Sequence, residues 1–210
     1  MHTEKHYAHF PERKDRSRFI YETFHPLLTR RVLDVGCYEA PLRHFVGKDL
    51  YHGIDFAGDP DQHIDLEKAE RLPFEDNAYP TVICIEVLEH LDNLHAMFSE
   101  LCRVSSSHVI VSLPNCWAVA RRHIERGRGK ISHYGLPHER PPDRHKWFFN
   151  CSEIISFFEA ASTSSCALER VLLIEKPRST LSRTFRHLVY SEECYTNRYT
   201  QTVLAVFKKT

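Results

Sequence analysis

The stretch RVLDVGCYEA at residues 31–40 and the shorter stretch IDF at residues 54–56 decide the fold of this chain. The first is an apolar, β-branched run that reaches Asp34 and turns at Gly36, as a strand does when it leads into a tight turn. The helix expected after the turn would present its N-terminal amides to a polar ligand. About 20 residues farther on, Asp55 ends a second strand, where a carboxylate can bind the two hydroxyls of a ribose. The two stretches therefore predict a nucleoside-binding edge of a parallel sheet.

The turn lacks the later glycines of a dinucleotide-binding motif. Such a motif keeps small residues where the backbone approaches a pyrophosphate, whereas this chain has Tyr38 and Ala40 at those places. Because a side chain at Tyr38 would obstruct a pyrophosphate, a ligand without phosphates fits the turn better.

Several motifs, in the expected order, resemble those of the class I S-adenosylmethionine (SAM)-dependent methyltransferases. The turn DVGCYEA at residues 34–40 resembles their first motif, D-x-G-x-G-x-G, and matches its acid and its first glycine. The stretch LPFED at residues 72–76 resembles the loop before the fourth strand, EVLEHL at residues 86–91 the signature after it, and SLPN at residues 112–115 the end of the fifth strand. An ordered series of this kind is more specific than any single motif. The resemblance covers roughly residues 30–160.

This resemblance, together with the alternation of apolar segments, predicts an α/β fold. We expect a Rossmann-like, doubly wound sheet of about seven strands, mostly parallel with an antiparallel last strand. Strands are expected near residues 31–35, 50–55, 61–65, 81–86, 108–113, 168–175 and 202–208, and helices near residues 12–28, 40–46, 68–71, 93–104 and 117–126. A further helix, capped by Asn150 or Ser152, should run to about Ala161. Residues 1–210 would form a single methyltransferase domain, with a helical N-terminal segment at 1–30 and substrate-side insertions or lids at 116–150 and 179–196.

Composition is that of a globular enzyme without a dominant charge. The chain has 210 residues, 28 Lys and Arg and 28 Asp and Glu, so no overall field would attract nucleic acid or an anionic membrane. The seven cysteines are odd in number and form no C-x-x-C motif, which favours reduced thiols and a cytoplasmic protein. No apolar stretch approaches the length of a membrane-spanning helix, and the start of the chain lacks the apolar core of a signal peptide.

The resemblance implies SAM as the cofactor and a set of residues that would bind it. The backbone of the turn would hold the methionine part, Asp55 the ribose hydroxyls, and Asp65 the adenine amine, with Phe56 and Leu66 on either side of the adenine. The expected cofactor-binding residues are Asp34, Gly36, Cys37, Tyr38, Asp55, Phe56, Asp65, Leu66 and Glu86.

Methyl transfer from SAM requires little chemistry from the protein, so a base or a metal ion would distinguish one enzyme from another. The sulfonium is already an activated donor, and the enzyme aligns it with the acceptor and removes a proton from a hydroxyl. Glu86, Glu89 and His90 would lie together at i,i+3 and i,i+4 spacing at the start of a helix, where they can bind a divalent cation. The expected catalytic residues are His90, Glu86 and His145, with His90 also a candidate general base.

His145, in the segment HKWFF, provides a fourth candidate ligand. Glu86, Glu89 and His90 with a distant His145 resemble the pattern E-x-x-E-H followed by H-K-F in small-RNA 2′-O-methyltransferases of the Hen1 type. The resemblance implies a Mg, Mn or Zn ion bound by Glu86, Glu89, His90 and His145. The alternative is that EVLEH lines the cofactor pocket and packs the helix start without a metal.

Three functions are consistent with the sequence. The leading one is methyl transfer to a small-molecule hydroxyl in a biosynthetic pathway; the alternatives are a Hen1-like RNA 2′-O-methyltransferase and a catalytically silent scaffold protein. The basic segment RRHIERGRGK at residues 121–130, with the loop through His133, Tyr134, His138, Arg140 and His145, would favour an anionic acceptor, or else be a solvated helix face. The apolar residues Phe185, Leu188 and Val189 would be an interface or a cover for the sheet, and the sequence leaves the oligomeric state open.

Overall fold

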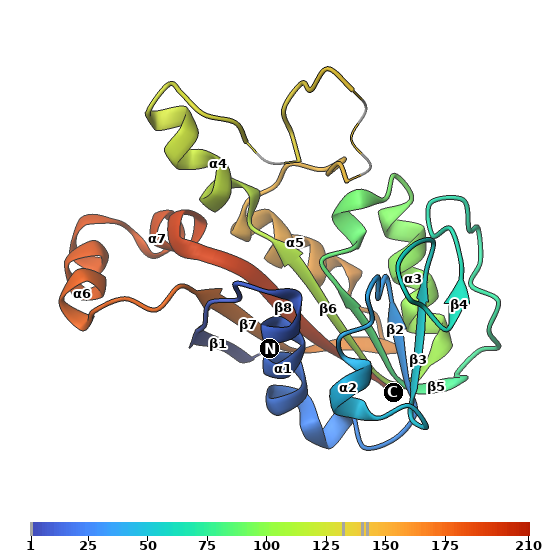
Figure 1. The fold of residues 1–210 in the computed structure, drawn as a ribbon. Helices are drawn as coiled ribbons and strands as arrows, with labels where there is room; N and C mark the ends of the chain where they lie inside the picture. Colours follow the sequence, from blue (N-terminus) through green and yellow to red (C-terminus); the bar gives the residue numbers. More distant parts are fainter. Residues whose placement is uncertain (1, 132, 140, 142) are drawn as a thin grey trace.

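One eight-stranded sheet organises the described part of the chain, as the computed structural model in Figure 1 shows; it describes residues 2–210 except 132, 140 and 142. The strand order is β1-β7-β8-β6-β5-β2-β3-β4, and β8 runs antiparallel to both of its neighbours. The strands are β1 (His2–Tyr7), β2 (Val32–Val35), β3 (Tyr51–Asp55), β4 (Gln62–His63), β5 (Tyr79–Ile85), β6 (Ser105–Pro114), β7 (Cys166–Glu175) and β8 (Thr200–Lys209). The predicted Rossmann-like, mostly parallel sheet is confirmed.

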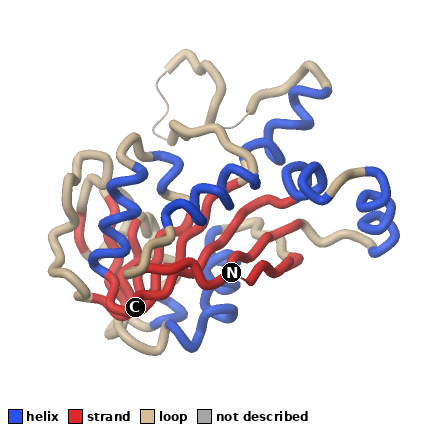
Figure 2. Tube along the Cα trace, turned by 180° about the vertical axis from the view of Figure 1, so that it is seen from behind, coloured by secondary structure: helices blue, strands red, loops and turns tan. Residues whose placement is uncertain are grey.

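Helices cover both faces of this sheet. They are α1 (Arg13–Phe24), α2 (Arg43–Val46), α3 (Leu94–Val104), α4 (Cys116–Glu125), α5 (Cys151–Ala161), α6 (Thr180–Val189) and α7 (Glu192–Tyr199), with short 3₁₀ helices η1 (His25–Leu27) and η2 (Leu88–His90). Side chains alternate along each strand, so Val32 packs with α1 and α2, whereas Leu33 packs with α3 and α5. Figure 2 shows helices on either side of the strands. Burial on both faces explains why the central strands read as continuous apolar runs.

The structure differs from the predictions at residues 2–7, at residues 68–71 and in the 179–196 insertion, which contains α6 and part of α7. Residues 2–7 form β1, which pairs in parallel with β7, although this segment has no apolar run that indicates a strand. Its pairing depends on tertiary contacts such as the ion pair between Glu4 and Arg170, 3.3 Å apart. The helix predicted at 68–71 is absent: residues 66–68 form a turn, and the Asn93 side-chain amide, rather than a following helical turn, donates to the carbonyls of Leu66 and Ala69.

The C-terminal edge of the parallel strands is where the predicted motifs meet. The strands β2, β3, β5 and β6 end there at Val35, Asp55, Ile85 and Pro114, and β8 begins there at Thr200. Successive connections leave from opposite sides of β2, which makes this edge a switch point of strand order. In open α/β sheets, ligands bind in the crevice at that point.

Candidate functional site

The turn after β2 keeps the backbone path of a glycine-rich turn although it has lost two glycines. Gly36, Tyr38 and Ala40 all have left-handed backbones, with φ of 79°, 48° and 51°. Two residues other than glycine in this conformation are uncommon and carry strain. At Gly36 a Cβ atom would lie 2.3 Å from Cγ2 of Val87, so only glycine fits. Tyr38 and Ala40 thus adopt the left-handed conformation that glycine adopts without strain.

Asp55 joins this turn to the end of β3. Its Oδ2 accepts a hydrogen bond from the Tyr38 amide (2.9 Å), and its Oδ1 accepts one from the Ala57 amide (3.1 Å). Each carboxylate oxygen can accept more than one hydrogen bond, so both retain capacity for a ligand. The predicted ribose-binding acid is thus fixed in position by the backbone of the cofactor turn.

Asp34, at the end of β2, is buried beneath the turn. The Tyr51 hydroxyl donates a hydrogen bond of 2.6 Å to its Oδ2. Burial raises the pKa of Asp34 to about 6, against the effect of that hydrogen bond, and the charge of Asp55 raises it further. The Cys37 thiol is buried beside it, and burial raises its pKa to about 12, so the thiol stays protonated near neutral pH.

We expect Asp34→Asn to stabilise the protein against unfolding at high pH but not at low pH. The folded-state pKa of Asp34 is raised from 3.8 to about 6, so its contribution is fully present below pH 3.8 and is lost as the pH rises through 6. Relative to its effect at pH 4, the variant should gain about 2.5 kcal/mol of unfolding free energy at pH 8. Urea titrations at both pH values measure this difference. The exposed Asp49→Asn is the control, and an equal effect of Asp34→Asn at pH 4 and pH 8 would contradict the assignment.

A small cavity beside Gly36 extends the site toward α1. Its volume is about 50 Å³, and Arg13, Arg16 and Ser17 line it together with Asp34 and Gly36. Small-molecule sites typically measure about 300–1,000 Å³, so this cavity can hold only one end of a cofactor. No residue of α1 was among the cofactor-binding residues predicted from the sequence, although the helix begins with a cluster of arginines, RKDRSR.

The three residues predicted to surround the adenine differ in how free their side chains are to contact a ligand. Phe56 is 65% exposed at the sheet edge and is free to stack on a ring. The Asp65 carboxylate pairs with Lys68 at 2.7 Å, and that ammonium group lowers its pKa. Leu66 is buried in the hydrophobic core. The structure thus gives Phe56 a free surface, whereas Asp65 already has a partner.

Glu86 does not share a helical face with Glu89 and His90, so that expectation is wrong. Its backbone is left-handed (φ 53°), and the chain then forms only the single 3₁₀ turn η2. Its carboxylate contacts Nη1 of Arg16 at 2.6 Å and accepts a hydrogen bond of 2.8 Å from the Thr202 hydroxyl. Glu86 therefore faces α1 and β8.

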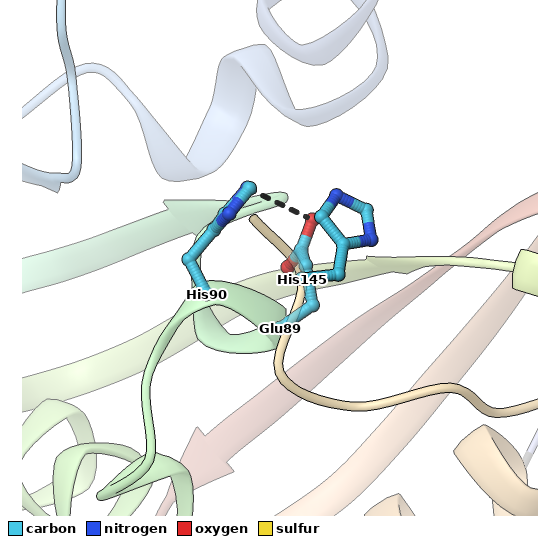
Figure 3. A group of neighbouring side chains, drawn as sticks. All are labelled: Glu89, His90 and His145. Atoms are coloured by element: carbon cyan, nitrogen blue, oxygen red, sulfur yellow. Dashed lines mark ion pairs between the residues drawn. The ribbon is translucent and has the colours of Figure 1, made fainter. Parts of the chain in front are cut away.

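Glu89, His90 and His145 are brought together (Figure 3). One ligand atom from each lies within 4.8 Å of the others, and Nε2 of His90 lies 3.9 Å from Oε1 of Glu89. His145 comes from the loop before α5, far along the chain from η2. Three of the four predicted metal ligands thus converge.

Hydrogen bonds orient both imidazoles. Nδ1 of His145 bonds to the Tyr134 hydroxyl (2.9 Å), which itself donates to the Trp147 carbonyl (2.6 Å). Nδ1 of His90 faces the Arg144 carbonyl oxygen at 3.2 Å. These partners place the proton on Nδ1 in each ring, which leaves the Nε2 lone pair for a cation.

The charge states of this group also suit a cation. Burial, and then the neighbouring His90 and His133, lower the pKa of His145 to about 3. Burial lowers the pKa of His90 as well, although the Asp143 carboxylate at 3.1 Å opposes this effect. Both rings are neutral near pH 7, and neutral imidazole is the form that binds metals.

The surroundings of Glu89 show whether these residues suit a metal ion. Its side chain is 1% exposed, and its Oε2 is buried without a hydrogen-bond partner among the described residues. Burial raises the pKa of Glu89 well above its ordinary value, and the charge of Glu86 raises it further. A buried carboxylate oxygen without a partner is costly, and a divalent cation would compensate it. The residues present therefore fit a metal.

The loop that contains His145 is fastened to the segment around η2. The Lys146 amide donates to the Glu89 carbonyl (2.8 Å), and the Lys146 ammonium pairs with Asp92 (2.5 Å) and with Glu67. The Trp147 indole donates to the Leu91 carbonyl (2.7 Å). Sequence analysis missed these anchors, although HKWFF lies in the motif that identified His145.

The basic segment of α4 only partly fits an anionic acceptor. Arg121 pairs with Glu125 at 3.0 Å, which neutralises its charge, whereas Arg122, Arg126 and Arg128 are exposed. Arg140, from the same prediction, lies outside the described residues.

Comparison with known proteins identifies the fold and the family. A family model described as a methyltransferase domain matches residues 7–162. No protein of curated function matches the chain in sequence. Among solved structures, the methyltransferase domain of bacterial CtHen1-C superposes with a TM-score of 0.61 at 18% identity, covering 93% of this chain and 97% of that one. Magnesium protoporphyrin IX methyltransferase (ChlM) from Synechocystis PCC 6803, with bound SAH, gives 0.57 at 16% identity, covering 94% and 83%. A SAM-dependent methyltransferase from Archaeoglobus fulgidus gives 0.56 at 16%, covering 95% and 96%. At these identities the likeness to solved structures shows a shared fold.

Proposed function

We propose that this chain, which belongs to the family of methyltransferase domains and is a SAM-dependent enzyme, transfers the methyl group to a hydroxyl oxygen of a small molecule. In this proposal a divalent metal assists the transfer. The observation that supports this proposal most directly is the convergence of Glu89, His90 and His145 at the sheet edge where the cofactor turn lies. Family membership favours this enzyme over the alternative of a silent scaffold.

The cofactor would lie along the ends of β2 and β3. In this proposal the backbone from Asp34 to Tyr38 contacts the methionine part, and the Asp55 oxygens accept hydrogen bonds from the ribose hydroxyls. Phe56 then stacks on the adenine. Arg16 lines the cavity at the other end, where its guanidinium can bind the carboxylate of methionine in bidentate geometry.

Glu89, His90 and His145 would hold the metal. One carboxylate and two imidazoles suit Mn or Zn better than Mg, which prefers oxygen ligands. The metal supplies a Lewis acid that lowers the pKa of an acceptor hydroxyl. The Nε2 lone pair of His90 can bind a cation or accept a proton but not both, so the proposal assigns His90 to the metal and not to general base catalysis.

A second candidate acceptor is the terminal ribose of an RNA. It is favoured by the order in the chain of E-x-x-E-H and then HKWFF, which resembles the pattern of the Hen1-type enzymes and of which the structure gathers Glu89, His90 and His145. The overall charge of zero disfavours it, because it provides no general attraction for a polyanion.

Labelled methyl transfer would test the acceptor class. The purified chain is incubated with tritium-labelled SAM and either a panel of catechols and aliphatic diols or a single-stranded RNA with a free 3′ end. We expect label on a diol that depends on Mn or Zn and disappears with EDTA. Label only on the RNA, and none on RNA whose 3′-terminal diol was oxidised with periodate before the reaction, would select the second candidate. Transfer that persists in EDTA would contradict the metal mechanism.

A further inference from the structure

Helix α6 presents an apolar face to solvent. Leu181, Phe185, Leu188 and Val189 are 84%, 68%, 81% and 55% exposed. Their spacing of i, i+4, i+7 and i+8 places them on one side of the helix. Contiguous exposed apolar surface of this kind marks an interaction site on a soluble protein.

The rest of this segment is cationic. Residues 176–190, KPRSTLSRTFRHLVY, include Lys176, Arg178, Arg183 and Arg186 and no acidic residue. Burial lowers the pKa of Arg178, and the nearby charges of Arg186 and Arg122 lower it further, so the positive charges are close together. Two acids lie beside the segment: Glu175, which directly precedes it and is buried, and Glu192 of α7, which is 3.5 Å from His187 and also pairs with Lys5.

Aromatic rings hold two of the cations beside the helix. The Arg183 guanidinium lies 4.2 Å from the centre of the Tyr7 ring, and that of Arg186 lies 4.3 Å from the Tyr199 ring. A cation–π contact holds an arginine side chain in place without neutralising its positive charge. The cationic side of α6 is therefore ordered, and its apolar side remains uncovered.

The position of α6 in the fold leaves this surface accessible. The helix leaves the end of β7 and returns through α7 to β8, and it projects beyond the sheet in both views (Figures 1 and 2). It extends from the edge where the cofactor turn and the histidine group lie. It also lies outside residues 7–162, so membership of the methyltransferase family does not account for it.

We infer that α6 is a membrane-surface helix that places its apolar face among the headgroups of an anionic lipid bilayer. An amphipathic helix with Phe and Leu on one side and Arg on the other has the composition of helices that lie in the membrane interface. A second copy of the chain fits less well, because residues 176–190 contain no acidic residue that could pair with the cations of the opposing copy. Binding would be peripheral: none of the described helices has both the length and the apolarity needed to cross a bilayer.

Vesicle sedimentation with the full chain tests this inference. Vesicles of phosphatidylcholine alone are compared with vesicles that also contain phosphatidylglycerol. We expect clear binding to the anionic vesicles and at least about tenfold weaker partitioning onto phosphatidylcholine. Arg183→Gln with Arg186→Gln should weaken binding to the anionic vesicles about 25-fold, since each surface cation contributes roughly fivefold. Leu181→Ser with Phe185→Ser and Leu188→Ser should remove it.

A matched control and a second readout complete the experiment. Ile124→Ser removes an equally exposed apolar side chain from α4 and should leave vesicle binding unchanged. SAM binding by calorimetry should be the same in all variants, which separates this inference from the proposed function and reports on folding. Two results would overturn it: no binding to either vesicle, or a dimer in lipid-free solution that the Leu181, Phe185 and Leu188 variant converts to a monomer.

Discussion

Replacing Glu89 with glutamine is expected to weaken divalent metal binding strongly while SAM binding remains within about twofold of the original. Glutamine keeps the size of the side chain but removes the negative charge and leaves an amide that binds cations weakly. Loss of one of three ligands should lower the affinity for Mn or Zn by at least about 100-fold. Calorimetric titration with each metal, with and without SAM, measures both effects, and metal-dependent methyl transfer should fall with the affinity.

The charge at Glu89 also distinguishes loss of a ligand from loss of the fold. Burial raises the pKa of Glu89, which means that the ionised carboxylate destabilises the metal-free protein. Glu89→Gln should therefore unfold at the same or a higher temperature than the original chain in EDTA. The exposed Glu70→Gln is the matched control for a surface carboxylate. Unchanged metal affinity in Glu89→Gln would contradict the site.

The same titrations decide the role of Glu86. Because its carboxylate contacts Arg16 and Thr202, Glu86→Gln should retain metal binding. Loss of binding in that variant would support the four ligands predicted from the sequence, and it would require Glu86 to leave Arg16 when the metal binds.

Asp55→Asn is expected to weaken SAM binding by at least about 100-fold, which corresponds to roughly 2.7 kcal/mol. Two hydroxyls of a ribose need two acceptor oxygens, and the asparagine offers one oxygen and an NH₂ group that donates. The asparagine oxygen can keep the bond from the Tyr38 amide, so the turn should persist. Titration with SAM and with its demethylated product, S-adenosylhomocysteine, measures the loss for both ligands.

Two further variants make this result interpretable. Asp49→Asn removes an exposed carboxylate at the approach to the same strand and should leave affinity unchanged. Tyr38→Gly relieves the left-handed strain at the turn and should preserve or increase affinity. SAM affinity in Asp55→Asn equal to that of Asp49→Asn would remove Asp55 from the cofactor site.

Local patterns in the sequence were sufficient for most of the fold. Strands β2, β5 and β6 contain apolar runs that local pattern identifies, because burial on both faces of the sheet requires them. Of the two predicted caps, Asn150 and Ser152, it is Asn150 that accepts the hydrogen bond from the Glu153 amide and caps α5. Strand β1 was missed, because its pairing with β7 joins segments more than 160 residues apart along the chain.

The sequence by itself determined the order of the motifs, the left-handed turn at Gly36 and the acid at the end of β3, since backbone sterics and side-chain alternation act over a few residues. Only the tertiary structure decided which acids and histidines meet. The single 3₁₀ turn of η2 separates Glu86 from Glu89, and the anchored loop brings His145 to His90. Tertiary packing likewise left the apolar face of α6 exposed, which periodicity could not distinguish from a face that covers the sheet. These outcomes depend on contacts between distant segments, whose energies no short stretch of sequence contains.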